Sequence, residues 1–104
     1  MSTQVQNSFR ALADPTRRDI LVLLSKQEMT IAEIADEFPM TRAAVKKHLT
    51  VLEQGQLITV HPSGRERVNR LEPRGMKNVT EWVKYFDQFW DDKLSALQNV
   101  INNQ

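Results

Sequence analysis

Residues 30–54 read TIAEIADEFPMTRAAVKKHLTVLEQ, and this stretch decides the fold. Thr30 can cap a helix with its side chain, and Glu33 stands three places later, which is the pattern of a capping box. Phe38 and Pro39 end that helix, because proline cannot continue it. A short helix is therefore predicted at the start of this stretch.

A second helix follows almost at once. Thr41 is its predicted N-cap, and it runs to about residue 54 with an apolar stripe of Val45, Leu49 and Leu52. Two short helices joined this closely cannot lie antiparallel along their length. The connection therefore predicts a helix-turn-helix.

Further helices are expected on both sides of this motif. The first runs from about residue 4 to residue 13, and another starts at Asp14-Pro15, an N-cap followed by a proline in the first turn. The last helix begins near Pro73 and continues to about residue 102, with apolar residues recurring at spacings of three and four.

Residues 57–60 and 67–71 have a strand-like pattern, and the segment 61–66 between them is rich in turn-forming residues, which predicts a β-hairpin. A chain of 104 residues is long enough for one domain with a hydrophobic core. We therefore expect a mainly α fold with a small β-hairpin, a winged helix-turn-helix of five helices plus a two-stranded wing. It forms a single DNA-binding domain over residues 1–104.

Basic residues gather in the middle of the chain. The formal net charge is only +1 at pH 7, but residues 41–70 hold six basic side chains against two acidic ones. The six are Arg42, Lys46, Lys47, Arg65, Arg67 and Arg70. A phosphate backbone is a natural partner for such a patch, and a solvated basic face is the alternative that charge alone leaves open.

The solvent face of the helix over residues 41–54 is the predicted reading surface, placed in the major groove of double-stranded DNA. Thr41 and the first N–H groups can hold a phosphate, Ala43 permits close approach to a base, and His48 is expected to bond phosphate or backbone. The wing over residues 61–67 is expected on the backbone or in the minor groove. The predicted DNA contacts are Thr41, Arg42, Ala43, Lys46, Lys47, His48, Arg65 and Arg67.

The last helix carries a longer aromatic stripe than four short helices and a hairpin can cover. Pairing with a second copy is the favoured interpretation, and folding back over its own core is the alternative. The predicted dimer interface is formed by Phe9, Leu12, Val83, Phe86, Trp90, Leu94 and Leu97. A two-fold dimer places two recognition helices about 34–36 Å apart, roughly one DNA turn, and so requires an inverted-repeat operator.

Three segments resemble the ArsR family of winged-helix repressors. They are FRALADPTRRDIL at residues 9–21, AVKKHLTVLE at 44–53 and SGRER at 63–67. The ending FWDDKLSAL at 89–97 is similar to the branch of that family without a conserved metal site. The resemblance implies a homodimeric repressor that dimerises through its first and last helices.

The chain departs from the family pattern at two places. Lys46 stands where the family usually has serine, which changes the contacts expected from the recognition helix. Gly55 comes one place early, so that Gln56 occupies the usual glycine position after the helix. A left-handed glutamine costs more than a glycine, so we expect an altered helix exit.

Several classes of protein are disfavoured by what the chain lacks. It has no cysteine, and its last helix offers carboxylates but no histidine, so neither a metal site nor a cofactor is expected. No enzyme is expected, because paired catalytic side chains and a glycine-rich phosphate loop are missing. Without a signal peptide or an apolar run of membrane-spanning length, the expected location is cytoplasmic, with no membrane partner.

Two alternative functions depend on the aromatic last helix. It could recruit another protein, with the basic face incidental, in a protein-interaction module. It could also hold a small molecule against Trp82, Phe86 and Trp90, in a small-molecule-responsive regulator. The sequence assigns no effector.

Overall fold

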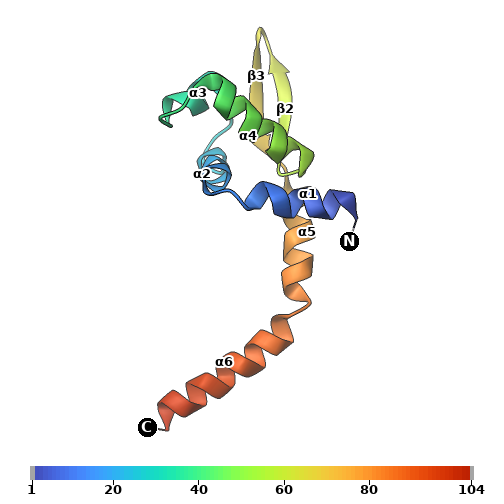
Figure 1. The fold of residues 1–104 in the computed structure, drawn as a ribbon, viewed down its shortest axis with the longest axis vertical. Helices are drawn as coiled ribbons and strands as arrows, with labels where there is room; N and C mark the ends of the chain where they lie inside the picture. Colours follow the sequence, from blue (N-terminus) through green and yellow to red (C-terminus); the bar gives the residue numbers. More distant parts are fainter. Residues whose placement is uncertain (1, 104) are drawn as a thin grey trace.

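A computed structural model describes residues 2–103 of the chain. Within that range the elements, in order, are α1 (Thr3–Leu12), α2 (Pro15–Leu24), β1 (Met29–Thr30), α3 (Ile31–Asp36), α4 (Arg42–Gln54), β2 (Ile58–Ser63), β3 (Glu66–Leu71), α5 (Pro73–Lys84) and α6 (Asp87–Asn102) (Figure 1). The winged helix-turn-helix predicted from the sequence is confirmed, with α3 and α4 as its two helices and the β2–β3 hairpin as the wing.

Three predicted N-caps start helices as expected. The Asp14 carboxylate accepts a hydrogen bond from the Arg17 backbone N–H at 3.0 Å, and Pro15 follows in the first turn of α2. Thr30 and Glu33 form the reciprocal capping box at the start of α3. Thr41 accepts from the Ala44 N–H at 3.1 Å. These local bonds place the helix starts without help from tertiary packing.

The sheet has three antiparallel strands in the order β1-β3-β2, one more than the hairpin predicted. β1 is only two residues long, too short to leave a periodic pattern in the sequence. The wing strands also extend further than expected, so that only Gly64 and Arg65 form the turn. Gly64 has a φ of +63°, and Pro62 is accommodated because β2 is an edge strand.

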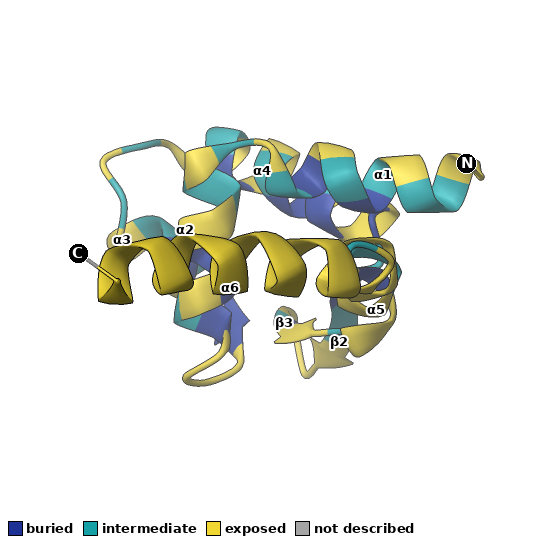
Figure 2. Cartoon of the chain, turned by 90° about the horizontal axis from the view of Figure 1, so that it is seen from below, coloured by how far each residue is buried: buried dark blue, intermediate teal, exposed yellow. Residues whose placement is uncertain are grey.

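The hydrophobic core lies between α1, α2, α3, α4 and the base of the sheet (Figure 2). Its most deeply buried large side chains are Ile20, Ile34, Val45, Leu52, Leu57 and Ile58. Each such aliphatic side chain contributes about 1.5–3 kcal/mol by leaving water. This core holds α4 by its inner face and leaves its outer face free.

The prediction of one last helix is wrong, because the chain bends at Phe86 and forms α5 and α6 instead. Phe86 has φ −98° and ψ 0°, and its N–H bonds the Val83 carbonyl three residues back. Tyr85 keeps helical angles, so the spacing of apolar residues continues across the bend. Periodicity alone therefore could not reveal it.

α6 extends away from the rest of the molecule (Figure 1). The structure measures 62 × 32 × 20 Å, with a radius of gyration of 17.8 Å. A compact chain of this length has a radius of gyration of about 13 Å. No helix in the described part is both long and apolar enough to span a bilayer.

Candidate nucleic-acid interface

The outer face of α4 carries a row of exposed cations. Arg42, Lys46 and Lys47, which we call the basic face, are all exposed, while Val45 and Leu49 on the opposite side are buried. None of the ion pairs formed among residues 2–103 includes a side chain of the basic face. These charges are therefore free to meet an external anion.

Thr41, Ala43 and Thr50 complete the surface around the basic face. All three are exposed. The Thr41 hydroxyl is already engaged as the cap of the Ala44 N–H, and the Thr50 hydroxyl donates to the Lys46 carbonyl at 3.0 Å. Ala43 has a short side chain, which leaves space beside the first turn of α4.

A groove of about 380 Å³ separates α4 from the wing. Arg42 and Lys46 line it from the recognition helix α4, while Arg65 and Arg67 line it from the wing. The fold thus brings together two groups of basic residues about twenty positions apart in the chain. Glu53 and Glu66 also line the groove, so its charge is mixed but predominantly positive.

Arg70 is the exception among the basic residues of the segment 41–70. Its Nε lies 2.9 Å from a carboxylate oxygen of Glu28, an ion pair beside β1. Arg70 does not line the groove, although Arg67 and Asn69 of the same strand do. Charge counting along the sequence could not distinguish this paired arginine from the unpaired ones.

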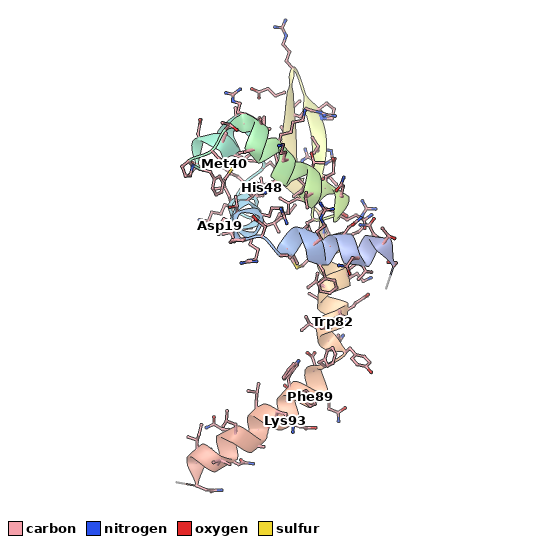
Figure 3. All side chains as sticks on the ribbon, viewed as in Figure 1. Asp19, Met40, His48, Trp82, Phe89 and Lys93 are labelled. Atoms are coloured by element: carbon pink, nitrogen blue, oxygen red, sulfur yellow. The ribbon has the colours of Figure 1, made fainter. Side chains whose placement is uncertain are left out.

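His48 lies apart from the other predicted DNA contacts. It is partly buried between α4 and the start of α2 (Figure 3), with its Nδ1 3.9 Å from the Asp14 carboxylate and 3.5 Å from the Arg17 guanidinium. The Arg17 N–H bond lowers the pKa of Asp14, and the nearby charges of Arg17 and His48 act in the same direction. His48 therefore has partners within its own chain, a role that its place in the sequence did not suggest.

Three of the expected dimer residues, Phe9, Phe86 and Trp90, are joined through Trp82 in a row of ring contacts that we call the aromatic ladder. Phe9 of α1 packs edge-on against Trp82 of α5, with ring centroids 5.6 Å apart. The ring centroids of Trp82 and Phe86 lie 5.0 Å apart, and those of Phe86 and Trp90 lie 6.5 Å apart. Trp82 is the link that the predicted interface omitted, because it lies at the edge of the apolar stripe.

The remaining interface residues divide into two groups. Leu12 packs against the core, so it is only partly available to a partner. Val83, Leu94 and Leu97 are exposed, and no described residue of α6 is buried. Figure 3 shows the side chains of α6, with Phe89 and Lys93 labelled, standing clear of the body. An exposed apolar surface therefore runs along α5 and α6.

No group of three or more potential metal ligands gathers among residues 2–103. The arrangement can instead bind an extended polyanion, through the basic face on one side of a groove and the wing on the other. The fold and this site define a winged helix-turn-helix DNA-binding protein.

Comparisons with known proteins agree with this class. A family model described as a helix-turn-helix domain matches residues 12–61. The HTH-type transcriptional regulator Rv2034 of Mycobacterium tuberculosis is 33% identical over 97 residues, which cover 93% of this chain and 88% of that protein. The transcriptional repressor SdpR of Bacillus subtilis is 32% identical over 90 residues, covering 86% of this chain and 100% of SdpR. The chain belongs to the ArsR family of winged helix-turn-helix transcriptional regulators.

Solved structures share the fold. A crystal structure of an ArsR family transcriptional regulator is 35% identical, with a TM-score of 0.76 and coverage of 85% of this chain and 91% of that chain. The solution structure of a homodimeric winged helix-turn-helix DNA-binding domain from Mycobacterium bovis is 25% identical, with a TM-score of 0.65. That match covers 83% of this chain and 82% of the other.

Proposed function

We propose that the protein is a transcriptional repressor that binds an inverted-repeat operator as a homodimer in the cytoplasm. The observation that carries the proposal is the groove in which Arg42 and Lys46 of the recognition helix face Arg65 and Arg67 of the wing. A surface with this shape and charge fits the edge of a DNA duplex, with a helix in the major groove and a hairpin beside it.

The recognition helix would read bases through its N-terminal half. Arg42 and Lys46 can donate to the O6 and N7 atoms of guanine, and Ala43 can contact a thymine methyl group. Lys47 would neutralise a phosphate, and so would the free N–H groups beside Thr41 at the start of α4. Lys46, in place of the serine usual in the family pattern, gives this half of the helix a second cation beside Arg42.

The wing would hold the duplex from the side. Arg65 lies in the hairpin turn and Arg67 near the start of β3, and both are exposed. Guanidinium groups on a thin hairpin can follow the sugar-phosphate backbone or enter a narrow minor groove. Either contact fixes the orientation of α4 over the bases.

The homodimer is supported by the uncovered apolar surface of α5 and α6. Nine large apolar side chains of α5 and α6 are roughly half exposed, and at about 90 Å² each they reach the roughly 800 Å² per partner of a stable interface. The similar domain from Mycobacterium bovis is homodimeric. A two-fold pair would present two recognition helices to one face of the duplex.

A salt titration of DNA binding tests this proposal. If the dimer neutralises about six to nine phosphates, log K falls with log salt concentration with a slope of roughly −5 to −8. The binding of a fluorescent duplex, followed by anisotropy between about 50 and 200 mM salt, measures this slope. A flat response, or no binding, would contradict the proposal and favour a module that binds proteins.

A further inference from the structure

The recognition helix is tied at its C-terminal end to α1. The Gln4 amide donates to the carbonyl of Gln54 at 2.9 Å, and the Ser8 hydroxyl donates to the carbonyl of Gly55 at 2.8 Å. Ser8 is completely buried, and the next possible acceptor of its proton, the Gln4 carbonyl, is further away at 3.3 Å. The shorter bond is the one that reaches α4.

The next two carbonyls are tied to α5. The Gly75 N–H donates to the carbonyl of Gln56 at 2.8 Å, and the Glu72 N–H donates to the carbonyl of Leu57 at 2.9 Å. A Cβ at Gly75 would stand 2.2 Å from the Gly55 oxygen, so only glycine allows α5 to approach this closely. Four consecutive carbonyls, of residues 54–57, are thus held by the helices that carry the proposed dimer surface. We call these four bonds the exit clamp.

Asn78 closes the clamp by joining α5 to α1. Its amide Nδ2 donates to the Ser8 hydroxyl at 3.2 Å. The Ser8 hydroxyl therefore accepts a hydrogen bond from α5 and donates one to the end of α4, so it acts as both acceptor and donor. One buried oxygen connects both proposed dimer helices to the recognition helix.

A Schellman arrangement closes the last turn of α4 but does not use the carbonyls that the clamp holds. The Leu57 N–H bonds the Leu52 carbonyl and the Gln56 N–H bonds the Glu53 carbonyl, which is the Schellman arrangement. Gln56 is left-handed in it, with a φ of +57°, as its replacement of the usual glycine predicts. The Schellman bonds leave the carbonyls of residues 54–57 to the clamp, so the clamp satisfies these four groups and at the same time fixes the direction of α4 relative to α1 and α5.

We propose that Ser8 and Asn78 are positioning residues that set the half-site spacing the dimer accepts on DNA. The inference rests on the proposed function, since spacing has meaning only for a dimer on two half-sites. α4 has 13 residues and is about 20 Å long. A rotation of roughly 10° at its exit would move Arg42 by about 3.4 Å, the rise of one base pair.

The test uses duplexes derived from a sequence selected from random DNA by the wild-type protein. Three kinds are compared by fluorescence anisotropy: the selected duplex, a duplex with one half-site, and duplexes with one base pair added or removed at the centre. The variants are Ser8→Ala, which removes the bridging hydroxyl, and Asn78→Ala, which removes its donor. Ser25→Ala and Thr80→Ala are matched controls, because both are exposed and bond only within their own helices.

The wild type and both controls should lose at least about tenfold in affinity when the spacing changes by one base pair. In Ser8→Ala and Asn78→Ala, affinity for the selected duplex should fall about five- to tenfold, and the loss on changing the spacing should shrink to about threefold or less. Binding to the single half-site should stay within about twofold of wild type, because the basic face is untouched.

A variant that binds less tightly but keeps the wild-type spacing profile would overturn the inference, since that result is expected from a merely structural role. Asn78 is only partly buried, so Asn78→Ala decides the question if Ser8→Ala fails to fold. A different result would contradict the proposed function itself. In that case the wild-type protein would bind the single half-site as tightly as the selected duplex.

Discussion

Both ends of the molecule are exposed, but their exposed surfaces have opposite chemistry. At one end, α4 and the wing present cations, over a helix whose inner face is held in the core. At the other end, α6 presents Trp90, Leu94 and Leu97, which are 51%, 61% and 57% exposed. Charged groups are well solvated, whereas an apolar surface of this size marks an interaction site. The difference favours a DNA-facing end that is complete in one copy and an opposite end that is complete only in a pair.

The largest expected effect comes from a substitution that disrupts the proposed dimer contact at the apolar end. Trp90→Ala should weaken dimerisation by about 3–5 kcal/mol, because it removes a large ring from the ladder that begins at Phe9. The body should stay folded, since Trp90 contacts the rings of Phe86 at the bend and Phe89 of α6, which lie outside the hydrophobic core. Sedimentation equilibrium measures the dimer, and circular dichroism measures the fold.

Tyr85→Ala provides the matched control for that experiment. Tyr85 is an aromatic residue at the α5–α6 bend; it touches the ladder only at Phe86, with ring centroids 5.0 Å apart, and is 82% exposed. It should leave the dimer dissociation constant within a few fold of wild type. A Trp90→Ala protein that dimerises as well as wild type would remove this residue from the interface.

The next effect tests the charged end. Arg42→Ala should cost about 1–3 kcal/mol in binding to the preferred sequence and relax the base preference at one position of each half-site. Lys47→Ala should weaken binding to all sequences alike and reduce the magnitude of the salt slope by about two, one for each subunit. Competition assays with matched and mismatched duplexes separate the two. If both variants bind like wild type, the basic face is not the reading surface.

A smaller effect concerns the support beneath α4. Asp14→Ala should destabilise the fold by about 1 kcal/mol at neutral pH, because it removes the cap of α2 and the carboxylate beside His48. The folded-state pKa of Asp14 is lowered, so its contribution is complete above the ordinary pKa and is lost as the pH falls through the lowered value. The difference between variant and wild type in urea denaturation should therefore shrink below about pH 4. An equal difference at pH 7 and pH 3 would contradict this assignment.

The smallest expected effect concerns Gln56, at the junction between the two ends. Gln56→Gly should stabilise the protein by roughly 0.5–1 kcal/mol, because glycine adopts the left-handed conformation at residue 56 without a Cβ penalty. The Gly75 bond to the carbonyl of residue 56 does not depend on the side chain. Thermal denaturation measures the gain. A lower Tm would show that the glutamine side chain contributes more than its backbone conformation costs.

Local signals were enough to predict the helices of the charged end and which face of α4 is outward. Capping residues such as Thr30 and Thr41 determine helix starts through bonds three residues long, and the stripe of Val45, Leu49 and Leu52 determines which face of α4 is outward. Both signals lie within a single turn or helix, so they are visible before any tertiary contact is known.

The features that escaped prediction depend on one residue or on distant partners. The bend at Phe86 changes the backbone at one position and leaves the apolar spacing intact. His48 lies beside Asp14, 34 positions earlier in the sequence. Ser8 forms hydrogen bonds with Gly55 and Asn78, which are 47 and 70 positions away. No periodic pattern carries contacts of this kind, because they arise only when separate helices pack.

The most direct test of the account is selection of bound fragments from random DNA by the purified protein. The account predicts an enriched inverted repeat whose half-sites are centred about 10 base pairs apart, the distance between two recognition helices on one face of the duplex. Enrichment of a single asymmetric site, or of no sequence at all, would contradict a dimer that reads DNA with two copies of α4.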